Sequence, residues 1–254
     1  MGELDLSIIL ILICLGFLAA FIDSVVGGGG LIMLPGLLSL GVPPAMALGT
    51  NKLAGSFGSL TSTIMFTRSG HVDLKKIGKL FPLTFFGAML GAYIVYLIDP
   101  ELLKPLMLIM LAGVLIYTLK KKDWNSIEAP KALSKKRFIT FAMLITFIGF
   151  YDGFLGPGTG SFLIFAFLLI GFDFVKAAGN AKLLNFGSNI GALAMFIVLG
   201  QVNYTYGLIL AAAQIVGSIV GSRFAIKRGA GYVRMLFIIV TVVLLIKNTY
   251  DYFS

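Results

Sequence analysis

Two lysines lie deep inside apolar stretches of this chain, where a charge is costly. Lys52 is seven residues into the apolar segment that begins at position 45, and Lys182 is eight residues into the segment that begins at 174. At the rise of a helix, each ammonium is then roughly 10–12 Å from its helix end. A lysine at membrane depth costs about 2.5–3.5 kcal/mol on insertion scales, which makes it a functional candidate. The alternative is that each long side chain snorkels back to the interface.

Each half of the chain also carries a carboxylate followed by a cluster of glycines. Asp23 precedes Gly27–Gly30, and Asp152 precedes Gly156–Gly160. Glycine runs break a helix and let the backbone approach a ligand closely. The helix that restarts after each cluster presents free N–H groups and a positive dipole end, which favours an anion. The alternative is a tight turn near the interface, with both carboxylates solvated.

Polar side chains accompany the two lysines. Lys182, Asn185 and Asn189 recur at i, i+3 and i+7, which places them on one helical face. The first half offers Thr50 and Asn51 beside its own lysine. Such groups could hydrogen-bond the oxygens of a ligand, or they could hold neighbouring helices together, as Ser and Asn often do in bilayers.

The elements that position these residues follow from composition. Of 254 residues, 58% are hydrophobic and only 12% are charged, with a mean hydropathy of +0.99. A soluble domain carries about 25% charged residues, and several apolar blocks here approach the roughly 20 residues that cross a bilayer as a helix. The sequence therefore predicts an all-α polytopic membrane protein.

The remaining composition excludes several classes of protein. The net charge is +9, but the basic residues cluster between apolar segments, as the positive-inside rule requires, so we expect no nucleic-acid partner. One cysteine and one histidine argue against a disulfide framework, a metal centre and a cofactor. The expected partners are the lipid bilayer, a small anion and protons, and the oligomeric state is left open.

The chain repeats itself at an offset of 129 to 130 residues. Four segments of the first half recur in the second, namely Phe21–Gly27 at Phe150–Gly156, Gly49–Leu53 at Gly179–Leu183, Gly70–Asp73 at Gly200–Asn203, and Gly87 with Gly91 at Gly217 with Gly221. Four matches in register indicate a duplication. We predict a first transmembrane repeat at 1–120, a basic cytoplasmic linker at 121–137 and a second repeat at 138–254.

Each repeat contains five apolar segments, so we expect about eight to ten membrane segments with glycine-broken helices. They lie at 6–26, 30–42, 45–67, 77–98 and 102–119, and at 138–155, 159–172, 174–199, 204–222 and 232–250. The second segment of each set has about 13 residues, or roughly 20 Å as a helix. It could cross obliquely, pair with its neighbour as a broken helix, or be re-entrant.

Loop charges predict that the two repeats are inverted. The loop at 68–79 has four basic residues and one acidic residue, whereas its counterpart at 200–204 has no charge. The loop at 99–104 is acidic, whereas its counterpart after 222 is basic. This reversal is what an inverted-topology repeat requires, and it places the N-terminus outside. The alternative is a parallel duplication with weak charge signals.

The aspartate–glycine motifs, taken with Gly49–Lys52 and Gly179–Lys182, resemble the TauE/SafE family over nearly the whole chain. The resemblance implies a multi-pass protein of the prokaryotic cell membrane that transports sulfite, organosulfonates or related sulfur anions. It also implies that the lysines and the glycine clusters form the site. The second half reads Asn-Ala-Lys where the first reads Thr-Asn-Lys, so the half-sites need not be equivalent.

We therefore expect a secondary transporter of a small oxyanion, driven or balanced by protons, and not an enzyme. The rival functions are an anion channel, a transporter of another small organic anion, a membrane enzyme and a structural subunit. We expect Lys→Ala variants to lose transport while still inserting into the membrane. The substrate contacts predicted are Lys52, Lys182, Thr50, Asn51, Asn180, Asn185, Gly28, Gly29, Gly158 and Thr159, and the predicted proton-coupling residues are Asp23 and Asp152.

Overall fold

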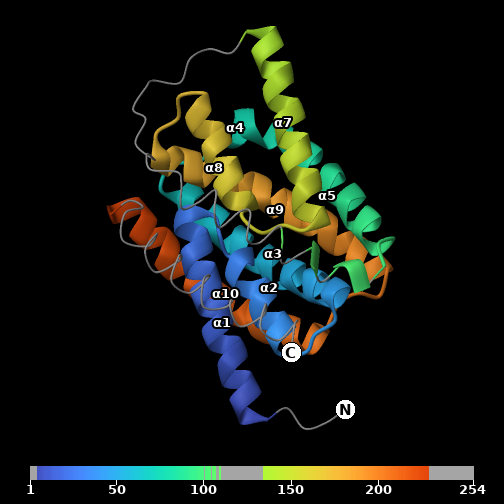
Figure 1. The fold of residues 1–254 in the computed structure, drawn as a ribbon. Helices are drawn as coiled ribbons and strands as arrows, with labels where there is room; N and C mark the ends of the chain where they lie inside the picture. Colours follow the sequence, from blue (N-terminus) through green and yellow to red (C-terminus); the bar gives the residue numbers. More distant parts are fainter. Residues whose placement is uncertain (1–4, 100, 104, 107–108, 110–133, 229–254) are drawn as a thin grey trace.

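The computed structural model of the protein describes all residues except 1–4, 100, 104, 107–108, 110–133 and 229–254. Within those bounds the regular structure is entirely helical (Figure 1). The helices are α1 (Leu6–Val26), α2 (Gly30–Ser39), α3 (Pro44–Arg68), α4 (Leu74–Ile77), the 3-10 turn η1 (Gly78–Leu80), α5 (Phe81–Tyr96), α7 (Lys135–Phe154), α8 (Thr159–Leu169), α9 (Phe174–Val198) and α10 (Tyr204–Arg228).

Five helical stretches of the described chain are long and apolar enough to cross a bilayer. They are α1, the stretch Leu74–Tyr96, α7, α9 and Tyr204–Lys227 of α10. The shorter α2 and α8 are also apolar. The prediction of an all-α polytopic membrane protein is confirmed. At 25 residues α3 is as long as α9, but the polar residues around Lys52 lower its hydropathy.

Eight of the ten predicted apolar segments correspond to helices. The segment at 232–250 and most of the one at 102–119 lie outside the described residues, as does most of the linker at 121–137. Two helix starts differ by more than one residue: α5 begins at Phe81 and not at 77, and α7 begins at Lys135 and not at 138. Ser134 caps this helix by accepting a hydrogen bond from the Arg137 N–H, so the helix extends beyond its apolar stretch into basic residues.

Both glycine clusters break the helix, as predicted. The first break follows α1, where Gly27 adopts a φ of 80° and donates its N–H to Asp23. The two breaks touch each other: a Cβ on Gly27 would lie 2.1 Å from the carbonyl carbon of Gly160. Ser161 of the second break donates its N–H to Gly27 O at 2.9 Å. Only glycine permits this contact, because it needs both a positive φ and no side chain.

The long helices pair across the two halves of the chain. Helix α1 lies along α10, and α7 lies along α5. Small residues bring the backbones together: a Cβ on Gly221 would lie 2.4 Å from Phe21 O, and one on Gly91 would lie 2.1 Å from Phe150 O. The equivalent helices α1 and α7 enter from opposite ends of the molecule (Figure 1). A two-fold relation between inverted halves would produce this packing, and the inverted repeat stays a prediction.

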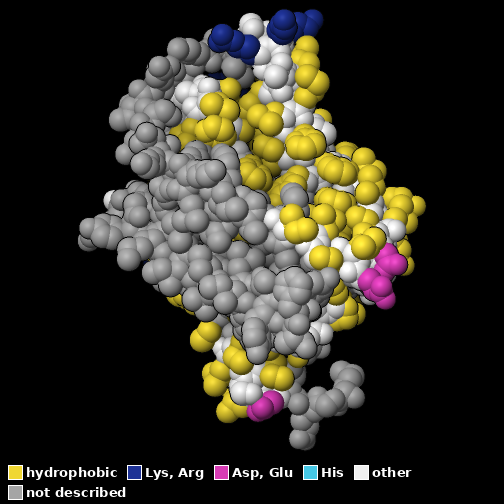
Figure 2. Space-filling view, viewed as in Figure 1, with side chains coloured by type: hydrophobic (Ala, Val, Ile, Leu, Met, Phe, Trp, Pro, Cys, Tyr) yellow, Lys and Arg dark blue, Asp and Glu magenta, His cyan; other side chains and the backbone are white. Residues whose placement is uncertain are grey.

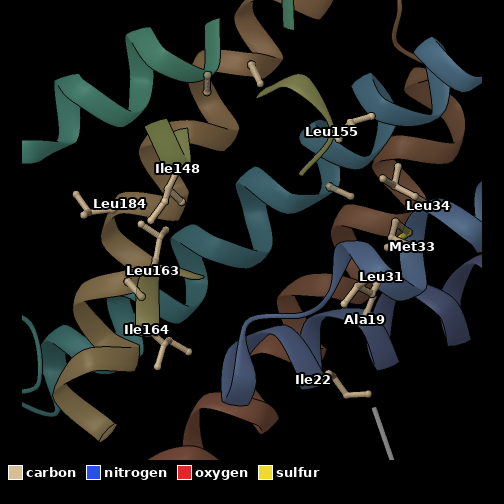
Figure 3. Packing of buried hydrophobic residues seen from close by; sticks show 14 of the residues in the cluster. Ala19, Ile22, Leu31, Met33, Leu34, Ile148, Leu155, Leu163, Ile164 and Leu184 are labelled. Carbon is tan, nitrogen blue, oxygen red and sulfur yellow. The ribbon is translucent and has the colours of Figure 1, made fainter. Parts of the chain in front are cut away.

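Apolar side chains fill the interior and also cover the outside. Figure 3 shows part of the core, with Leu31 of α2 close to Ala19 of α1. On the outer face, Phe86 is 66% exposed and Phe147 is 67% exposed. Hydrophobic side chains dominate the described surface in Figure 2, whereas lysines and arginines gather where α7 begins. Such an apolar surface, with basic residues gathered at one end, is typical of a protein that is surrounded by lipid.

Candidate functional site

Two buried ion pairs join the halves of the chain. Lys52 Nζ on α3 lies 2.7 Å from Asp152 Oδ1 on α7. Lys182 Nζ on α9 lies 2.6 Å from Asp23 Oδ2 on α1. The lysine side chains are 1% and 0% exposed, so neither snorkels to the surface in this structure. Each lysine thus pairs with the aspartate of the other half.

The two carboxylates differ in their surroundings. The Asp23 side chain is 24% exposed, and its second oxygen accepts a hydrogen bond from the Gly29 N–H at 3.2 Å. The Asp152 side chain is 3% exposed, and its Oδ2 has no hydrogen-bond partner among the described residues. A buried carboxylate oxygen without a donor is costly. The half-sites are therefore not equivalent.

A cavity of about 40 Å³ lies between the ion pairs and the glycine breaks. It has room for roughly three water molecules, or for one small ion. Both halves of the chain contribute to its wall, which is formed by Ala19, Asp23, Gly27, Gly29, Gly30, Asn51, Lys52, Gly55, Asp152, Gly156, Gly158, Thr159, Gly160, Asn185, Asn189 and Gln214. Both α2 and α8 begin in this wall, so their N-terminal ends face the cavity region.

The structure brings most of the predicted site residues together at this cavity. Those in its wall are Asp23, Gly29, Asn51, Lys52, Asp152, Gly158, Thr159 and Asn185. Lys182 is not in the wall itself, but it donates a hydrogen bond to Asp23, which is. Gly28 is buried within the first break but is not in the wall. Thr50 and Asn180 lie outside it too.

Thr50 and Asn180 hold the loops of the opposite halves. The Thr50 hydroxyl oxygen accepts a hydrogen bond from the Asn203 N–H at 3.0 Å. The Asn180 side-chain oxygen accepts one from the Asp73 N–H, also at 3.0 Å. In this structure both side chains therefore anchor a loop, and their contact with a substrate stays a prediction.

Sequence reasoning singled out Asn189 by its helical face but left Gln214 unexplained. Gln214 of α10 is 5% exposed and stands in the cavity wall. Its Oε1 would lie 2.4 Å from a Cβ on Gly58, so the glycine in α3 makes room for the carboxamide. A glutamine inside an apolar segment was the signal in the sequence that could have marked this residue. Its contact with Gly58 could not be predicted, because the two residues are far apart in sequence.

The cavity carries no net charge from its ion pairs when both carboxylates are ionised. Two ammonium groups and two carboxylates then cancel. Removing one member of either pair would leave an unpaired buried charge, which is strongly unfavourable. Among the described residues there is no group of three or more His, Cys, Asp or Glu side chains that could hold a metal ion.

The family model described as "Sulfite exporter TauE/SafE" matches residues 12–248. The chain belongs to the TauE/SafE family. This confirms the resemblance seen in the aspartate–glycine and lysine motifs.

Relatives within the TauE/SafE family extend over almost the full chain. A probable membrane transporter protein, ORF9, of Sinorhizobium is 38% identical over 99% of this chain and 96% of its own. One from Haemophilus influenzae is 36% identical over 98% and 97%, and YfcA of Escherichia coli is 37% identical over 95% and 89%. No solved structure matches significantly. The protein is thus a multi-pass membrane transporter of this family.

Proposed function

We propose that this TauE/SafE protein is a secondary transporter of a small oxyanion, most suitably sulfite or a small organosulfonate, coupled to protons. The observation that carries the proposal is the pairing of each buried lysine with an aspartate at one cavity. Ammonium groups bind oxyanions, and carboxylates bind protons. The arrangement therefore provides for both species at one place.

The coupling follows from charge balance. When a proton binds Asp152 or Asp23, the partner lysine loses its counter-ion and is free to pair with an anion. One anion and one proton together leave the charge of the cavity unchanged. An anion alone would add an uncompensated charge in surroundings where water cannot screen it. Binding of the two is therefore cooperative.

The backbone supplies further donors to the anion. The glycine breaks place main-chain groups of Gly30 and Gly158 in the cavity wall, whereas the Gly29 N–H is already bonded to Asp23. The N-terminal ends of α2 and α8 add partial positive charge there. The side chain of Asn51 lies in the same wall. A pyramidal or tetrahedral oxyanion has several acceptor oxygens, which this set of donors matches.

The loop charges support an orientation in the cell membrane. The basic residues at the start of α7 and in the loop at 68–79 lie on the cytoplasmic side in this proposal. The N-terminus, which carries Asp5, lies outside. Helices α1 and α7 then enter the bilayer from opposite faces, as their arrangement in Figure 1 allows.

Flux into proteoliposomes tests the proposed function. We expect saturable uptake of sulfite or methanesulfonate that changes when a pH gradient is imposed. Lys52→Met and Lys182→Met should each reduce this uptake at least tenfold. Lys76→Met is the matched control, because Lys76 is 84% exposed and its ion pair with Asp73 is on the surface.

Three results would count against the proposal. Uptake of cations or neutral solutes, with none of any anion, would exclude an oxyanion transporter. Uptake that does not saturate and does not respond to a pH gradient would indicate an anion channel instead. Normal uptake in both lysine variants would remove the ion pairs from the mechanism.

A further inference from the structure

The carboxamide of Asn189 has a fixed orientation in the cavity wall. Its Nδ2 donates a hydrogen bond to the Asn185 carbonyl oxygen at 2.8 Å, one turn earlier in α9. The side-chain oxygen is therefore directed away from that carbonyl. It faces α3, where a Cβ on Gly55 would lie 2.9 Å from it. A carboxamide oxygen can only accept hydrogen bonds, and the hydrogen bond of this carboxamide to Asn185 uses its nitrogen and leaves the oxygen to accept.

The position equivalent to Asn189 in the first half contributes no side chain to the cavity wall. This position is Ser59, at an offset of 130. Ser59 donates to the Gly55 carbonyl oxygen, just as Asn189 donates to that of Asn185. The Ser59 hydroxyl oxygen could itself accept a hydrogen bond, but Ser59 is absent from the cavity wall. At this position, therefore, only the second half supplies an acceptor to the cavity.

The ion pairs restrict the charge of the ligand. The titratable side chains in the cavity wall are Asp23, Lys52 and Asp152, with Lys182 bonded behind Asp23. These four charges cancel. A monovalent anion is balanced by one proton on one carboxylate, whereas a divalent anion needs both carboxylates neutralised. Burial of unbalanced charge is costly, so the cavity favours the monovalent form.

We infer that the site binds its oxyanion in the monovalent, hydroxyl-bearing form, HO–XO₂⁻ or a close relative. The charged oxygens of the ligand accept from a lysine and from backbone N–H groups, and its hydroxyl donates to Asn189 Oδ1. This inference rests on the proposed function and specifies the substrate class of the same site. It gives Asn189 the role of an acceptor, whereas a deprotonated oxyanion would need a donor there.

Binding of three probe anions to the purified full chain tests the inference. The probes are hydrogen selenite (monovalent with a hydroxyl), methanesulfonate (monovalent without one) and sulfate (divalent without one). We expect hydrogen selenite to bind about five- to tenfold more tightly than methanesulfonate, the size of one hydrogen bond. Sulfate should bind most weakly. The affinity for hydrogen selenite should fall as the pH rises and the ligand loses its last proton. Methanesulfonate has no such proton, so any fall in its affinity reports titration of the protein. We expect that fall to be smaller.

Asn189→Ala removes the carboxamide acceptor without adding a hydroxyl and is the matched variant. It should bring the affinities for hydrogen selenite and methanesulfonate to within about twofold of each other, with sulfate still the weakest.

An unchanged ratio in a folded variant would overturn the role of Asn189. Sulfate binding as tightly as the monovalent probes would overturn the charge argument, and so would selenite binding that strengthens as pH rises. If methanesulfonate and sulfate bind but hydrogen selenite does not, only this inference fails. If no anion binds, the proposed function fails as well.

Discussion

Removing Lys52 should destabilise the protein, and removing its partner as well should restore stability. Lys52 and Asp152 form a pair that is 1% and 3% exposed, so solvent cannot take over either charge. Breaking a buried pair by deleting one partner costs about 3–5 kcal/mol, because the other charge is left uncompensated. In Lys52→Met the stranded group is Asp152, whose Oδ2 already lacks a donor.

The double variant Lys52→Met/Asp152→Leu removes both charges and keeps similar side-chain volumes. Replacement of a buried pair by apolar residues is often neutral or stabilising. We therefore expect the double variant to be within about 1 kcal/mol of the parent, or above it, which gives a coupling free energy of at least about 3 kcal/mol. For a chain of this length the single variant should melt roughly 6–20 °C lower.

Thermal unfolding of the purified variants in detergent measures these shifts. The second pair supplies an internal comparison: Lys182→Met should cost less than Lys52→Met, because Asp23 is 24% exposed and has a second donor in Gly29. If the double variant melts as low as the worse single variant, the pair is not coupled and the reasoning is refuted. The sequence alone predicted that a lysine variant still inserts into the membrane, and the buried pair adds the expectation that the inserted variant is less stable.

Three further predictions concern topology, the glycine break and a helix cap. Cysteines placed singly at His71 and Asn203 should label from the cytoplasm and from the outside respectively; labelling from one side would exclude the inverted repeat. Gly41 has a φ of 77° but open space around it, so Gly41→Ala should lower the free energy of unfolding by about 1–2 kcal/mol. Gly27→Ala should lower it by at least about 1–3 kcal/mol more, because the added Cβ would meet the second break. Equal melting points of the two variants would contradict the contact between the breaks. Burial acts to raise the pKa of Asp173, but hydrogen bonds from the first turn of α9 and nearby positive charge leave that pKa lowered. Asp173→Ala should therefore cost about 1 kcal/mol near pH 7. That difference is fully present above the ordinary aspartate pKa and disappears as pH falls through the lowered one, so a pH-independent loss would count against it.

The sequence by itself determined the helical segments and the residue types of the site. Long apolar blocks leave a helix as the way to satisfy every backbone group in lipid, so α1 was predicted with its observed bounds. The glycine clusters predicted where helices break, because glycine readily adopts a positive φ and loses more backbone entropy in a helix than other residues do. A lysine and an aspartate in each half were costly in such surroundings, and this alone made them candidates.

Only the tertiary structure decided which residue meets which. The halves repeat the same motif, so the sequence is equally compatible with Lys52 pairing with Asp23 or with Asp152. The structure pairs each lysine with the other half, because the packing of α3 against α9 and the contact of the two glycine breaks interleave the halves.

The same holds for side-chain direction at single positions. Thr50 and Asn189 are both polar residues on the lysine-bearing helices, yet one anchors a loop and the other lines the cavity. Helical periodicity assigns a face but not the neighbour on it. Hydrophobic patterns act along one helix. Ion pairs, cavities and close glycine contacts depend instead on residues far apart in sequence, such as Lys182 with Asp23, which are 159 positions apart.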